Sequence, residues 1–221
     1  LIRIGNTNKE KCSFTDEDPY LINFKNTYRF SNPLLLDLCN KISSKRPNIH
    51  AELVSPLSMK DREKCVKLNC LEKAFDMIMI FLNNNVIPGN IAIITPMNKE
   101  KCEIKTTYDT LIQKLTAEGL SVAEEIDPSI IYCSSIQSVK GLEFDYVFFI
   151  GCSDYPKYMA GTYRNKNDGD SMNFVANSRA RKNIFYITDS SNLLPEHVPE
   201  DYVIGEEGIP KKNYRYNFPN S

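Results

Sequence analysis

Residues 130–151 read IIYCSSIQSVKGLEFDYVFFIG, two apolar runs on either side of a short polar turn. The second run, residues 146–150, has no polar alternation and is rich in aromatic and β-branched residues, which is typical of a strand covered on both faces. In the turn, Gly141 lets the backbone approach a ligand closely, and Lys140 and Glu143 offer a cation and an anion. We predict a strand, a loop and a second strand, with a ligand-binding loop. The alternative is a charged connection between two core strands.

Helical and strand patterns alternate along the rest of the chain. Ser31 or Asn32 can cap a helix that begins with Pro33, and Gly119 can close another helix. Such alternation predicts an α/β domain with a mainly parallel sheet flanked by helices. The predicted strands cover about 21–30, 50–54, 91–96, 120–123 and 184–188, and the predicted helices cover about 33–43, 71–82 and 108–115.

Composition indicates a globular protein with one sizeable domain. The chain has 221 residues, of which 42% are hydrophobic and 25% are charged. We predict no membrane partner, because no apolar stretch approaches the roughly 18 to 20 residues of a membrane span. The net charge of −1 means that any contact with nucleic acid must come from a local basic strip.

Seven cysteines occur without a Cys-x-x-Cys pair, and the chain has only two histidines. This pattern predicts reduced thiols in a cytoplasmic protein and no metal site. The first residue is Leu1, which indicates a fragment or a processed product. We divide the chain into an N-terminal extension at 1–20, a domain at 21–190 and an irregular acidic tail at 191–221.

The loop resembles motif V of the UvrD/Rep-like superfamily 1 helicases, usually Thr-x-His-x-x-Lys-Gly-Leu-Glu-Phe before an apolar strand. Residues 140–144 match it, while Ser135 and Gln137 stand in place of Thr and His. The resemblance implies that Ser135, Gln137 and Lys140 lie on the nucleic-acid side. It also implies that Gly141 and Glu143 face the nucleotide, with Glu143 accepting a hydrogen bond from the ribose.

Residues 26–29 resemble motif IV of the same helicases, usually Asn-Tyr-Arg-Ser. In that family the tyrosine lies against the nucleotide base and the arginine reaches the γ-phosphate. The resemblance gives these roles to Tyr28 and Arg29. The alternative is a surface pair without function.

Residues 174–181 resemble motif VI, typically Tyr-Val-Ala-x-Thr-Arg-Ala-Arg or Lys before a strand, with Ser178 in place of Thr. Val175 and Ala176 point inward on the predicted helix, and Arg179 lies one turn further along that face. A buried or cleft-facing arginine needs an anion. We predict that Arg179 acts with Arg29 as a catalytic cation on the γ-phosphate; the alternative is a structural salt bridge.

Tyr155 and Tyr158 lie in a polar stretch, residues 154–170, that also contains lysines and an arginine. Aromatic side chains stack on bases while cations meet phosphates, so this stretch is a candidate for contact with single-stranded nucleic acid. The alternative is an ordinary surface loop.

The three motifs occur in family order, which implies a RecA-like fold and the second motor domain of an ATP-dependent DNA helicase. Fewer than 40 residues separate Pro96 from Ser135, so the family's large accessory insertion is absent or reduced. No Gly-x-x-x-x-Gly-Lys-Ser/Thr loop or strand ending in Asp-Glu occurs. The family places both in the first motor domain, which we expect as the partner, together with single-stranded DNA.

We therefore expect ATP and Mg²⁺ to be held mainly by that first domain, and this chain alone to be inactive. One alternative is a helicase-derived adaptor without motor activity, which the substitutions at Ser135 and Gln137 favour. A stand-alone nucleotide-binding enzyme of the doubly wound type is disfavoured, because no Gly-rich phosphate loop occurs at a strand-to-helix turn.

Overall fold

A computed structural model describes eight parts of the chain: residues 29–44, 57–58, 60, 63–68, 71–96, 105–151, 173–187 and 198–205. Several sequence predictions lie outside them. Tyr28, Tyr155 and Tyr158 are among these, as are the predicted strand at 50–54 and nearly all of the one at 21–30.

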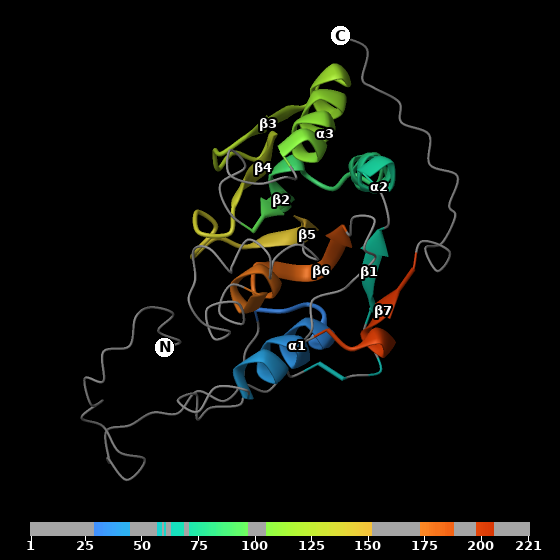
Figure 1. Ribbon diagram of the computed structural model, residues 1–221, viewed down its shortest axis with the longest axis vertical. Coiled ribbons are helices and arrows are strands. Elements are labelled where there is room, and N and C mark those ends of the chain that lie inside the picture. Colours follow the sequence, from blue (N-terminus) through green and yellow to red (C-terminus); the bar gives the residue numbers. More distant parts are fainter. Residues whose placement is uncertain are drawn as a thin grey trace, which may run out of the picture.

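A seven-stranded sheet forms the centre of the domain, in the order β3-β4-β2-β5-β6-β1-β7 (Figure 1). Every paired strand runs parallel to its neighbour. The predicted α/β fold with a parallel sheet is confirmed. The strands are β1 (Cys65–Leu68), β2 (Ile91–Thr95), β3 (Ser121–Ala123), β4 (Ile130–Ser135), β5 (Phe144–Ile150), β6 (Ala180–Ile187) and β7 (Val203–Ile204).

Helices cover both faces of the sheet. The helix α1 (Pro33–Ser44) lies on one side, and α2 (Leu71–Asn83) and α3 (Lys105–Ala117) lie on the other (Figure 1). Two short 3₁₀ turns, η2 (Pro88–Asn90) and η4 (Glu200–Tyr202), precede β2 and β7. The interval between β2 and β4 contains α3 and β3, and β3 is an edge strand of the same sheet.

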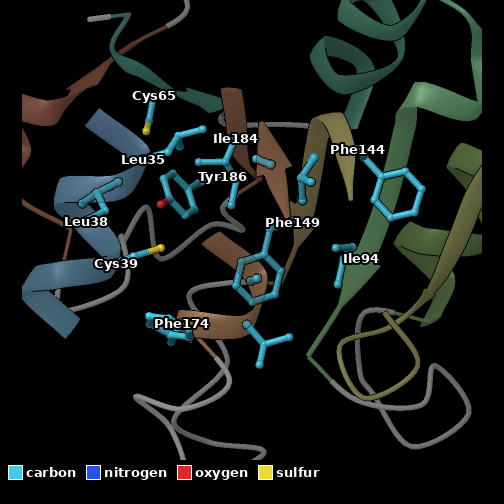
Figure 2. Packing of buried hydrophobic residues seen from close by; sticks show 14 of the residues in the cluster. Leu35, Leu38, Cys39, Cys65, Ile94, Phe144, Phe149, Phe174, Ile184 and Tyr186 are labelled. Atoms are coloured by element: carbon cyan, nitrogen blue, oxygen red, sulfur yellow. The ribbon is translucent and has the colours of Figure 1, made fainter. Parts of the chain in front are cut away.

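The central strands are apolar on both faces because each face has its own core. In β5, Val147 and Phe149 pack toward α1, whereas Phe148 and Ile150 pack toward α2 and α3. Successive strand residues point to opposite faces, so a doubly covered strand needs a continuous apolar run. Figure 2 shows the first core, in which Leu35 and Leu38 of α1 face Tyr186 and Ile184 of β6.

Helix α1 begins where the sequence predicts. The side-chain oxygen of Asn32 accepts a hydrogen bond from the backbone N–H of Leu34 at 3.1 Å, and Pro33 occupies the first helical position. The Asn32 amide also donates to the backbone oxygen of Glu63 at 2.8 Å, which joins the start of α1 to the segment before β1. This junction fixes the chain directly after Arg29.

Residues 198–205 differ from the irregular tail that the sequence suggests. Val203 and Ile204 pair in parallel with β1, and Tyr202 is buried against α1. The Tyr202 hydroxyl donates to Asp37 and accepts from Lys41 Nζ at 2.8 Å. Strand pairing and the hydrogen bonds of the Tyr202 phenol therefore join this short segment to the sheet and to α1. The predicted domain boundary at residue 190 stays a prediction.

None of the helices in the described parts of the chain is long and apolar enough to cross a membrane.

Candidate nucleotide-facing arginine site

The loop between β4 and β5 runs from the side of the sheet where the parallel strands end, called the carboxyl edge here, to the side where they begin, called the amino edge. Ser135, the last residue of β4, pairs with Thr95 at the end of β2, and the Ile136 N–H donates to the Thr95 carbonyl at 2.9 Å. Phe144, the first residue of β5, pairs with Ala180 at the start of β6. Residues 136–143 therefore connect the carboxyl edge of the parallel sheet to its amino edge.

Arg179 lies at the amino edge, directly before β6. Residues 173–177 form a helical turn, and Ser178 and Arg179 form the turn that leads into the strand. Arg179 is only 6% exposed. Its guanidinium donates to the carbonyl of Leu142 at 2.8 Å, to the carbonyl of Val175 at 3.2 Å and to the Ser178 hydroxyl at 2.9 Å.

Arg29 contacts the same backbone carbonyl. Its NH2 group donates to the Leu142 oxygen over a long 3.5 Å, and its Nε lies 3.2 Å from a carboxylate oxygen of Glu143. Gly141 has a φ of 88°, in the left-handed region, where the loop turns toward this carbonyl. The two arginines predicted from motifs IV and VI thus converge on one acceptor, the Leu142 carbonyl.

The electrostatics of this arginine site reflect the crowding of two cations. Burial lowers the pKa of Arg179 to about 10, with a further contribution from Arg29, while Glu143 opposes the change. Burial raises the pKa of the Cys39 thiol to about 12 against the effect of both arginines. Two guanidinium groups with one carboxylate leave an excess positive charge, so the arrangement suits an added anion such as a phosphate.

Two of the predicted nucleic-acid residues, Ser135 and Gln137, lie at the other end of the β4–β5 loop from this cluster. Ser135 is half-buried at the carboxyl edge, and Gln137 and Lys140 are exposed along the loop. The structure brings Arg29, Glu143 and Arg179 together and separates Ser135 and Gln137 from them. Within the described residues, no group of three or more histidine, cysteine or acidic side chains could hold a metal ion.

Two features of the site were not predicted from the sequence. The first is the Leu142 carbonyl as the shared acceptor, because a backbone atom leaves no residue-type signal. The second is Asp145, which is 5% exposed and pairs with Arg181 and Lys182 on β6. A carboxylate inside an otherwise apolar strand is a sequence signal that could have drawn attention to it.

Comparison with known proteins bears on the family and the fold of the chain. Residues 91–191 match the family model of the UvrD-like helicase C-terminal domain, a span that contains the motif V and motif VI stretches but not Arg29. Among solved structures, the chain is similar to the C-terminal domain of a possible DNA helicase from Lactobacillus plantarum WCFS1. The two share 16% identity and a TM-score of 0.51, over 81% of this chain and 99% of that chain. No curated protein sequence matches. The chain therefore resembles the C-terminal domain of UvrD-like helicases, as its motifs predict, both in the sequence of residues 91–191 and in its RecA-like fold.

Proposed function

We propose that this chain acts as the second motor domain of an ATP-dependent superfamily 1 DNA helicase or translocase. In this proposal Arg29 and Arg179 contribute two cations to the γ-phosphate of ATP when a first motor domain closes on this one. The observation that carries the proposal is the convergence of both guanidinium groups on the Leu142 carbonyl beside Glu143.

The chemistry of phosphoryl transfer explains why two arginines suit this place. Negative charge spreads over the γ-phosphate oxygens in the transition state, and preorganised cations stabilise it. The side chains of Arg29 and Glu143 are 28% and 42% exposed, whereas Arg179 is 6% exposed. An anion that binds from solvent would therefore contact Arg29 and Glu143 first. The more buried Arg179 would contribute its positive charge from deeper in the domain.

Glu143 would have to release Arg29 when the phosphate binds. Their ion pair of 3.2 Å partly neutralises the more exposed guanidinium, and an incoming phosphate would compete for it. Once released, the Glu143 carboxylate is free to accept the hydrogen bond from the ribose that we predict for it. Tyr28, predicted to lie against the base, and Gly141 would complete the nucleotide contacts of this domain.

The loop from residue 136 to residue 143 offers a direct path between the two ligands. We place single-stranded DNA at Ser135, Gln137 and Lys140, with Tyr155 and Tyr158 as further contacts, and ATP at the other end. ATP and Mg²⁺ would be held mainly by the first motor domain, which is the proposed partner. A shift of the loop would then change the contacts to DNA at one edge of the sheet and the contacts to ATP at the other.

The alternative is an adaptor that has lost motor activity. In support of it, both arginines already have acceptors within the chain. Ser135 and Gln137 also depart from the usual motif V residues.

Hydrolysis of ATP by the protein that carries this domain together with a first motor domain tests the proposal. Arg179→Ala should lower the DNA-stimulated turnover by about 10³, the usual effect of removing an arginine finger. Lys114→Ala is the matched control, because Lys114 pairs with Glu72 on the surface between α3 and α2. If the unaltered protein shows no DNA-stimulated hydrolysis, the adaptor is favoured. If Arg179→Ala keeps the full turnover, Arg179 is not a cation that acts on the γ-phosphate.

A further inference from the structure

Arg181 joins the three segments that carry the arginine site. It lies on β6 two residues after Arg179, and its backbone carbonyl accepts hydrogen bonds from the N–H groups of Ser31 at 2.8 Å and Asn32 at 3.2 Å. These two residues directly follow the Arg29–Phe30 pair. The main chain of Arg181 therefore fixes where the Arg29 side chain starts.

The side chain of Arg181 makes the third connection. Both its Nε, at 3.0 Å, and one terminal nitrogen donate to Oδ1 of Asp145, which lies two residues after Glu143. Lys182 Nζ contacts the other carboxylate oxygen at 2.9 Å. Burial alone would raise the pKa of Asp145, but the hydrogen bonds from Lys182 and Arg181 outweigh it and hold the pKa below its usual range. Asp145 is therefore charged at neutral pH.

We propose that Arg181 is a positioning residue, whose ion pair with Asp145 holds the loop end of Glu143 and Leu142 against Arg29 and Arg179 so that one polyphosphate can contact both arginines. This inference rests on the proposed function, because it concerns the same anion site. It adds a role for a residue that does not itself touch the phosphate.

A purely structural role would have a different signature. The Arg181 side chain is 42% exposed, and Asp145 would keep Lys182 if Arg181 were truncated. Because the buried Asp145 carboxylate would still have a cation, the large loss of stability that follows when a buried charge is left unpaired is not expected. Truncating the Arg181 side chain should therefore change the placement of Arg29 relative to Arg179, while the domain stays folded.

Nuclear magnetic resonance of the arginine Nε–Hε groups measures this placement on the 221-residue chain. Inorganic tripolyphosphate serves as the probe, since it carries the charge of the ATP phosphates without the base or ribose. In the unaltered chain, the Arg29 and Arg179 signals should shift together and give one dissociation constant. In Arg181→Ala that constant should rise about fivefold, the order of one part-exposed ion pair, and the two arginines should no longer follow one curve.

Two further variants separate placement from charge. Lys182→Ala also removes one cation beside Asp145, yet it leaves the Arg181 pair intact, so its affinity should stay within about twofold of the unaltered chain. Arg181→Lys keeps the charge and one donor to Asp145 and should restore joint binding.

Each outcome is decisive. If tripolyphosphate shifts neither signal in the unaltered chain, the chain has no anion site of its own and the positioning role is overturned, whereas the proposed function is decided by the turnover of Arg179→Ala in the two-domain protein. If the unaltered chain binds and Arg181→Ala behaves like Lys182→Ala, only the positioning role is overturned. An Arg181→Ala chain that does not fold would also overturn it, because Arg181 would then be a residue of the fold.

Discussion

Replacing Arg179 by methionine should leave the fold nearly as stable as before. The pKa of Arg179 is lowered to about 10, first by burial and then by Arg29. A depression of this size means that keeping the guanidinium charged costs the folded state roughly 3 kcal/mol. Methionine removes that cost and fills most of the space, but it loses three hydrogen bonds worth roughly 0.5–1.5 kcal/mol each.

The two effects nearly cancel, so the free energy of unfolding should change by at most about 1–2 kcal/mol. A cation whose pKa is lower in the folded state reduces stability at every pH below that pKa. Stability recovers only as the pH rises above about 10, so the comparison should not depend on pH between about 6 and 9.

Urea unfolding of the chain measures this change. Arg179→Ala is the companion variant, and it should be less stable than Arg179→Met because it leaves a cavity beside Val175. A loss of more than about 3 kcal/mol in the methionine variant would refute the reasoning, since that is the scale of breaking a buried polar network. Arg179 would then belong to the fold rather than to the anion site.

Tyr186→Phe should lower the free energy of unfolding by about 1–3 kcal/mol, because the buried Tyr186 hydroxyl donates to the side-chain oxygen of Asn177 at 2.5 Å; an unchanged urea midpoint would contradict this. Gly89→Ala should cost about 1–3 kcal/mol, since a Cβ there would lie 2.4 Å from the backbone oxygen of Asp127. Its control is Gly119→Ala, where φ is +78° but no atom lies within 4 Å, so only backbone strain of about 1 kcal/mol is expected; a larger loss in the control would reject the contact argument. Binding of a labelled single-stranded oligonucleotide should be weak and should weaken further with salt, because the net charge is −1 and only local cations are available; tight binding that ignores salt would contradict this.

Local patterns predicted the helices well because their signals lie within one or two turns. The Asn32 cap, Pro33 and the leucines of α1 specify that helix without help from distant residues. The β4–loop–β5 unit was predicted for a similar reason, since a doubly covered strand needs an unbroken apolar run. Both elements have the bounds expected to within two residues.

Short strands and contacts between distant segments could not be predicted in this way. Strand β1 has four residues and β7 has two, and each is defined by its partner in the sheet rather than by its own sequence. Arg29 and Arg179 lie 150 positions apart, so only the family resemblance suggested that they act together. The family resemblance did not suggest the ion pair between Arg181 and Asp145, which depends on the register of β5 and β6.

A double-mutant cycle on Arg29 and Arg179 tests the central claim most directly. The measurement is the DNA-stimulated turnover of ATP by the protein that carries both motor domains. If the two arginines act on one phosphate, each alanine variant alone should lower turnover by about 10³ and the double variant should be little worse than either. Effects that multiply, or turnover that survives the loss of both arginines, would contradict the account.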